Sequence, residues 1–143
     1  MTIRSGIKRA IHPLGWSRPR GYSNGWLASG PVLFIAGQIG WDPHSNSSKL
    51  PKVFAEQFEQ ALLNVLAVVR EAGGRPEDLV RLTIYVSDVQ EYQGAAKKLA
   101  GIWVRHMGRH YPAMTLVEVS RLLESSAQVE LEGTAILERS KDA

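Results

Sequence analysis

The stretch YPAMTLVEVSRLLESSAQVELEGTAIL, residues 111–137, decides the fold because it holds two segments of alternating polarity. The first segment alternates between two sets, Ala113, Thr115, Val117, Val119 and Met114, Leu116, Glu118, Ser120. The second alternates between Val129, Leu131, Gly133, Ala135 and Gln128, Glu130, Glu132, Thr134. Successive side chains of a strand point to opposite faces of a sheet. The pattern therefore predicts two strands, each with an apolar face and a mixed face.

The mixed faces of these two strands are unusual in composition. They carry the carboxylates Glu118, Glu130 and Glu132 beside the apolar side chains of Met114 and Leu116. Such a face is too acidic for a hydrophobic core and too apolar for an ordinary solvated surface. We expect a partner subunit or a ligand to cover it.

The composition bounds the class of protein. A chain of 143 residues indicates one domain over 1–143, with an irregular arm at 1–20 and a polar tail at 139–143. The absence of cysteine excludes disulfides, thiol nucleophiles and thiolate metal sites. No segment has the apolar length of a signal peptide or a membrane span, so we expect a cytoplasmic protein without a membrane partner. The formal net charge is only +3 and its basic residues gather near the N-terminus, so no nucleic-acid partner is expected.

Two short apolar runs, 22–29 and 32–39, flank a Gly30-Pro31 turn signal and predict a hairpin. In the second run Leu33, Ile35 and Gly37 share one face, and Phe34, Ala36 and Gln38 share the other. The following segment, 42–51, is rich in turn-forming residues and predicts a surface loop.

Apolar residues at helical spacing predict a helix over 53–72, which ends at Gly73-Gly74, and a second over 89–107, which ends at Gly108. Between them, 79–88 alternates as a strand. The order strand, strand, helix, strand, helix, strand, strand predicts an α+β fold, a mixed sheet with both helices on one face. The other face then forms a subunit interface with pockets at its edges, and collects Phe34, Ala36, Gln38, Arg81, Thr83, Tyr85, Met114, Leu116, Glu118, Glu130 and Glu132.

Several segments together resemble the reactive intermediate deaminase family, also called RidA or YjgF. They are GYSN at 21–24, AGQIGWDP at 36–43, the helix with Gln57 and Asn64 that ends in EAGG at 71–74, LVRLTIYVSD at 79–88, YPAMTLVEV at 111–119 and VELEGTAIL at 129–137. The resemblance implies a chorismate-mutase-like fold and a homotrimer with clefts between subunits. It also implies hydrolysis of a small enamine or imine, such as 2-aminoacrylate, to a carbonyl compound and ammonia without a cofactor.

The resemblance also assigns roles to individual residues. Glu130 takes the place of the catalytic glutamate that positions or deprotonates water, and Tyr22 and Gly37 match substrate-binding positions. Met114 replaces the arginine that clamps the substrate carboxylate, and Ala36 replaces a serine. Loss of that charge-assisted hydrogen bond removes about 1.5–3 kcal/mol of binding. With Ala113 beside Met114, and with Trp41 in reach of the cleft, we expect a larger, less anionic or aromatic-derived substrate.

Simpler interpretations remain open for the same residues. Glu130 also fits an ion pair with Arg81 or with a neighbouring subunit, and Trp41 fits a plain subunit contact. His106 and His110 have a four-residue spacing, but Gly108 interrupts the helix between them, so no metal site is predicted. The alternative functions are a non-catalytic, small-metabolite-binding or regulatory trimer and, with less support, an RNA-directed role.

Overall fold

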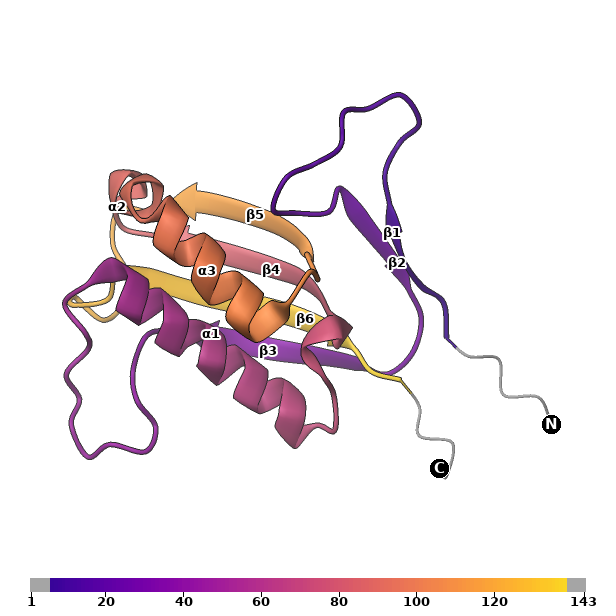
Figure 1. The fold of residues 1–143 in the computed structure, drawn as a ribbon. Helices are drawn as coiled ribbons and strands as arrows, with labels where there is room; N and C mark the ends of the chain where they lie inside the picture. Colours follow the sequence, from indigo (N-terminus) through magenta and orange to yellow (C-terminus); the bar gives the residue numbers. More distant parts are fainter. Residues whose placement is uncertain (1–5, 139–143) are drawn as a thin grey trace.

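A four-stranded mixed sheet forms the body of the protein in the computed structural model, which describes residues 6–138 (Figure 1). The strands lie in the order β3-β6-β4-β5, with bounds β3 Val32–Gln38, β6 Val129–Ile136, β4 Leu79–Val86 and β5 Ala113–Glu118. β4 and β5 run parallel, whereas β6 is antiparallel to both β3 and β4. The predicted α+β class and mixed sheet are confirmed, and β3 and β5 are the two edges.

The helices cover one face of this sheet, as predicted (Figure 1). The bounds are α1 Phe54–Glu71, α2 Val89–Gly94 and α3 Ala96–Met107, with a short 3₁₀ turn, η1, at Pro76–Asp78. The predicted second helix is thus interrupted at Ala95. It ends at Gly108, whose φ of 63° lies in the left-handed region that glycine tolerates. Within residues 6–138, no helix is both long enough and apolar enough to span a membrane.

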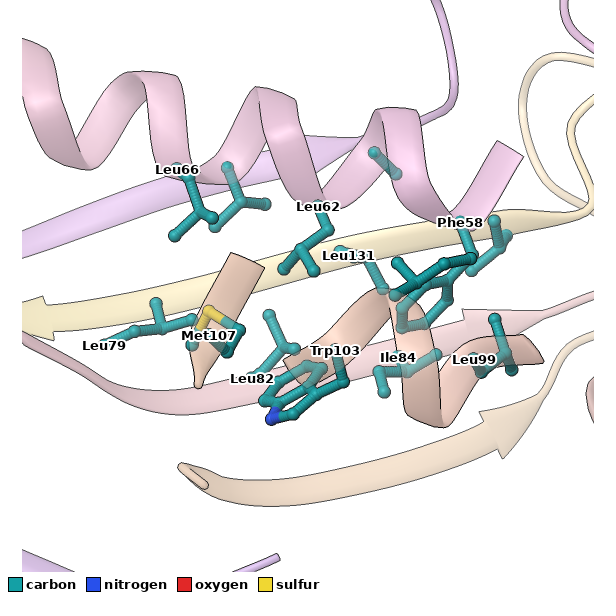
Figure 2. Close-up of a cluster of buried hydrophobic side chains, with 14 of the residues drawn as sticks. Phe58, Leu62, Leu66, Leu79, Leu82, Ile84, Leu99, Trp103, Met107 and Leu131 are labelled. Carbon is teal, nitrogen blue, oxygen red and sulfur yellow. The ribbon is translucent and has the colours of Figure 1, made fainter. Parts of the chain in front are cut away.

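The core lies between the helices and the sheet, as Figure 2 shows. Phe58, Leu62 and Leu66 point from α1 toward Leu82 in β4 and Leu131 in β6 (Figure 2). The other labelled side chains, Ile84 and Leu79 from β4 and Leu99, Trp103 and Met107 from α3, complete the cluster. Each such large apolar side chain contributes roughly 1.5–3 kcal/mol when fully buried, so this layer fixes how α1 and α3 lie on the sheet.

The predicted hairpin is wrong. β2 (Gly25–Ala28) pairs antiparallel with β1 (Lys8–Ile11) in a separate two-stranded sheet, and β3 pairs with β6. At the turn, Gly30 has φ 141°, and a Cβ there would lie 2.6 Å from the carbonyl oxygen of Leu137. The chain therefore passes against the end of β6 as it crosses from the small sheet to the main one.

The predicted irregular arm needs a correction for the same reason. Residues 8–11 form β1, although 12–20 contain no helix or strand. Residues 1–5 of that arm, and the predicted polar tail at 139–143, lie outside the described residues.

The faces of β4 and β6 agree with the prediction, but those of β5 are reversed. Met114 pairs with Leu82 and Leu116 with Ile84, so both side chains lie on the helix side, against the core. Glu118 follows them to that side and accepts a hydrogen bond from the Val89 main-chain N–H at 3.0 Å, at the start of α2. The open face carries Ala113, Thr115 and Val117 instead.

A β-bulge changes the faces of β3. Ile35 pairs with Gly133, but the next pair is Gln38 with Leu131, so β3 holds one extra residue at this point. Gln38, predicted on the open face, is thereby in register with core residue Leu131. Gly37, predicted on the same face as Ile35, turns toward Glu130 on the open face.

Candidate functional site

The carboxylate of Glu130 lies directly against Gly37. Glu130 is half-buried on the open face of β6, in register with Tyr85 of β4. A Cβ at Gly37 would lie 2.0 Å from Glu130 Oε1, so the carboxylate fills the space of the missing side chain. This arrangement brings a carboxylate beside bare backbone at an exposed position of β3.

The Glu130 carboxylate has no protein partner within residues 6–138. None of the side-chain hydrogen bonds or ion pairs of this part of the chain involves Glu130 or Arg81. The ion pair with Arg81 that the sequence left open therefore does not form within the protomer. A half-buried, unpaired carboxylate is available to a water molecule, a ligand or a second subunit.

Helix α1 holds the segment that follows Gly37. Asn64 Nδ2 donates to the carbonyl oxygens of Ile39 at 3.1 Å and Trp41 at 2.8 Å. The Trp41 side chain remains 44% exposed beyond the end of β3, and Ala36 is exposed within the bulge. We call Ala36, Gly37, Trp41 and Glu130 the β3-edge cluster.

The remaining predicted residues lie at the opposite edge of the sheet. Ser23 forms a parallel bridge with Ala113 at the start of β5, and its N–H donates to the Pro112 carbonyl at 3.0 Å. This contact places the neighbouring, 45% exposed Tyr22 at the β5 edge. Met114 is half-buried on the helix side of β5. We call Tyr22, Ala113 and Met114 the β5-edge cluster.

Met114 lines an apolar pocket of about 230 Å³. The pocket lies between α3 and the sheet, and its walls include Phe58, Leu99, Trp103 and Tyr111. Trp103 stacks on Tyr111 with ring centroids 6.1 Å apart and an interplanar angle of 8°. No charged side chain lines this pocket. It suits an apolar or aromatic group and offers nothing to neutralise a carboxylate.

Tyr92 supplies one hydroxyl to the wall of the apolar pocket. Burial raises the pKa of this phenol above its ordinary value of 10.0, because the apolar surroundings disfavour the phenolate. The hydroxyl therefore stays neutral at physiological pH and is able to donate or accept a hydrogen bond. Sequence reasoning placed Tyr92 and Trp103 on a helical stripe and treated them as core, because pocket and core positions share the same periodicity.

The two clusters do not meet within one protomer. β6 and β4 separate β3 from β5, so Glu130 and Met114 belong to different edges, and they also lie on opposite faces. The structure thus brings Glu130 and Gly37 together and keeps both apart from Tyr22, Ala113 and Met114.

The two histidines flanking Gly108 have structural partners. His106 Nε2 lies 3.0 Å from Glu59 Oε2, and His110 Nε2 lies 2.6 Å from the carbonyl oxygen of Leu79. Among residues 6–138, no three His, Cys, Asp or Glu side chains gather in a group able to hold a metal ion.

Comparison with known proteins gives concordant matches over most of the chain. The family model described as Endoribonuclease L-PSP matches residues 17–137. A RutC family protein of Pyrococcus horikoshii is 30% identical over 132 residues, which are 92% of this chain and 100% of the relative. The 2-iminobutanoate/2-iminopropanoate deaminase of Escherichia coli K12 is 30% identical over 107 residues, 75% of this chain and 80% of the relative.

A solved structure agrees with these matches. A Rid-family protein of unknown function from Yersinia pestis superposes with a TM-score of 0.76 at 31% identity, covering 91% of this chain and 98% of that one. The order of helices and strands and the mixed sheet are therefore those of known Rid proteins.

Proposed function

Because the chain belongs to the RidA/YjgF family, whose family model is described as Endoribonuclease L-PSP, we propose that it is a cofactor-independent hydrolase that deaminates a small enamine or imine. The products are a carbonyl compound and ammonia. The deaminase name of the Escherichia coli relative supports this reaction class.

The observation that carries the proposal is the unpaired Glu130 carboxylate against Gly37. In imine hydrolysis, water adds to the carbon of the C=N bond and loses a proton, and the nitrogen gains protons and leaves as ammonia. A carboxylate within hydrogen-bonding reach of the water accepts the first proton and returns it to the nitrogen. The bare backbone at Gly37 lets the substrate approach this carboxylate closely.

We further propose that the active site forms between copies of the chain. The β3-edge cluster and the β5-edge cluster lie at the two different edges of one sheet. A head-to-tail contact that joins one subunit's β3 edge to the next subunit's β5 edge combines the two clusters, and such a heterologous contact closes into a ring. The homotrimer that the family resemblance implies is a ring of this kind, with three clefts.

The substrate preference follows from the residues around Met114. A methionine forms no ion pair with a carboxylate, and the apolar pocket beside it accepts a hydrocarbon or aromatic group. Ala36 likewise offers no hydroxyl at the β3 edge. We therefore propose a bulkier and less anionic imine than 2-aminoacrylate as the preferred substrate.

The replacement of the two polar substrate contacts by Met114 and Ala36 also favours a second candidate, a trimer that binds a small metabolite without reacting with it. The two candidates share a cleft and differ in product formation. The binding candidate predicts saturable binding across a panel of imines with no ammonia released above the uncatalysed rate.

Substitution of Glu130 tests the hydrolase proposal. Glu130→Gln keeps the shape and removes the base, so we expect ammonia release to fall by about 100-fold or more, in the range ascribed to general base catalysis. Glu132→Gln is the matched control, because Glu132 is exposed on the same face two residues along β6. Retention of full turnover by Glu130→Gln, with an unchanged oligomeric state, would remove Glu130 from the mechanism.

A further inference from the structure

A second, larger hollow lies on the other side of Gly21 and Tyr111 from the apolar pocket. Its volume is about 750 Å³. It is enclosed by the loop that leaves β1, by Trp26 of β2 and by the segment Arg109 to Tyr111 after α3. We call it the basic pocket. In Figure 1 the loop between β1 and β2 extends well beyond the two-stranded sheet, which leaves room for this hollow.

The charge of the basic pocket has one sign. Arg18 and Arg109 line it together with His12 and His110, and no aspartate or glutamate contributes to its wall. Neither guanidinium has a carboxylate partner within residues 6–138. Two unpaired guanidinium groups in a hollow attract an anion, and their planar forks match the two oxygens of a carboxylate.

Aromatic side chains form the rest of the wall. Trp16 is 65% exposed and Tyr22 is 45% exposed, so each presents a ring face to an incoming ligand. Trp26 stands behind them, tilted against the His110 ring with centroids 5.1 Å apart. Exposed aromatic rings beside arginines favour a flat, aromatic molecule that carries a negative charge.

The inner wall is held in place before any ligand arrives. Trp26 Nε1 and Ser23 Oγ both donate to the carbonyl oxygen of Tyr111, at 2.9 Å and 2.6 Å. His110 is fixed by its bond to Leu79, and Asn24 Nδ2 lies 3.2 Å from His12 Nδ1. A preformed wall loses little conformational entropy on binding, which is the usual state of a ligand site.

From this geometry we infer that the basic pocket binds a small aromatic carboxylate, its ring against Trp16 or Tyr22 and its carboxylate on Arg18 and Arg109. A phosphate is the poorer match. Phosphates favour the N-terminus of a helix, whereas α3 reaches this pocket with its C-terminal end, where the backbone carbonyls disfavour a doubly charged group. The inference does not depend on hydrolase activity, because Glu130 does not line this pocket.

The test uses indole-3-acetate as the aromatic carboxylate and indole-3-acetamide as its neutral isostere, with heat of binding measured by titration calorimetry. We expect saturable binding of indole-3-acetate and at least 10-fold weaker binding of the amide. The double variant Arg18→Gln/Arg109→Gln should weaken binding of indole-3-acetate at least 10-fold, because each charge-assisted bond contributes that much. Arg70→Gln/Arg121→Gln is the matched control, since both residues are exposed and lie outside the pocket.

Further arms separate the possible outcomes. Glu130→Gln should bind indole-3-acetate as the unmodified protein does, which keeps this site distinct from the proposed active site. Adenosine monophosphate is titrated in parallel, and tighter binding of that nucleotide would overturn the carboxylate assignment. Equal affinity for acid and amide, unchanged binding by the Arg18/Arg109 variant, or no saturable binding of indole-3-acetate at millimolar concentration would each overturn the inference.

Discussion

Glu130 and Gly37 depend on each other for their positions. The carboxylate occupies the volume that any side chain at position 37 would need, with Glu130 Oε1, Cδ and Cγ at 2.0, 2.8 and 3.0 Å from a Cβ built there. The Glu130 side chain is flexible, so an added methyl group displaces the carboxylate more easily than it displaces the backbone.

Gly37→Ala should therefore impair activity more than folding. We expect ammonia release to fall by about 10-fold or more, since a displacement near 1 Å at a reacting group has effects of that order or larger. The thermal midpoint should stay close to that of the unmodified protein. The measurement is a paired assay of turnover and thermal unfolding.

Gly101→Ala is a suitable control for that substitution. Gly101 lies exposed in α3, and a Cβ there meets nothing within 4 Å. The change should leave turnover unchanged and stabilise the helix by roughly 0.5–1 kcal/mol. A Gly37→Ala protein with full turnover would show that the Glu130–Gly37 contact is unimportant for the reaction.

The contact between these two residues was not predictable from alternation. The resemblance marked both positions, but parity along β3 assigned Gly37 to the covered face with Ile35. The bulge between Ile35 and Gln38 reverses that parity. A bulge depends on how two strands pair, and a single strand's pattern of polarity contains no record of it.

Among the elements, the two-stranded sheet is attached to the body by a buried ion pair. Lys8 of β1 contacts Asp78 in η1, and the two side chains are 17% and 3% exposed. Asp78 also accepts the Arg75 main-chain N–H at 2.8 Å. Loss of the lysine leaves a charged carboxylate in a buried position.

Lys8→Met should lower the free energy of unfolding by about 3 kcal/mol, in the range for removal of one partner from a buried pair. Adding Asp78→Asn removes the uncompensated charge, so the double variant should recover part of the loss. Denaturant unfolding of both single variants and the double variant gives the coupling energy. A Lys8→Met protein within 0.5 kcal/mol of the original would show that the pair contributes little.

The sequence was informative for helices and for buried strands, and less so at the edges. α1, β4 and β6 have neighbours that impose a strict polarity pattern, and each was predicted with its buried face. β5 is an edge strand whose two faces are similar in polarity, with Val117 on the open side and Glu118 on the helix side. Alternation there defines two faces without showing which one meets the helices.

The pairing of β2 was mispredicted for a related reason. A Gly-Pro turn between two apolar runs favours a hairpin, but the partner of β2 is the segment KRAI at Lys8–Ile11. Its basic residues concealed its strand character within an arm that contains Pro13 and Pro19. The basic pocket, which depends on this arrangement, was equally hidden from sequence reasoning.

For the whole molecule, the open face of the sheet should be the surface that joins the subunits. Phe34 is 80% exposed in β3, in register with Thr134, on the face that no helix covers. An exposed aromatic ring on such a face is typical of an interface.

Phe34→Glu should therefore dissociate the proposed trimer into monomers of 15.8 kDa, because a buried, unpaired charge is unfavourable at an interface. Leu123→Glu serves as control, since Leu123 is fully exposed in the loop between β5 and β6. Light scattering coupled to size-exclusion chromatography gives the mass of each. An unmodified protein that elutes as a monomer would contradict the shared-site proposal.

Ammonia release by the unmodified protein tests the account most directly. Imines are generated freshly in the assay, 2-aminoacrylate beside a bulkier aromatic imine, and the rates are compared with uncatalysed hydrolysis and with those of Met114→Arg. The account predicts acceleration with the bulky imine preferred, and a shift of preference toward 2-aminoacrylate in Met114→Arg. Uncatalysed rates for both imines, from protein that is folded and trimeric, would contradict the hydrolase proposal and favour the binding candidate.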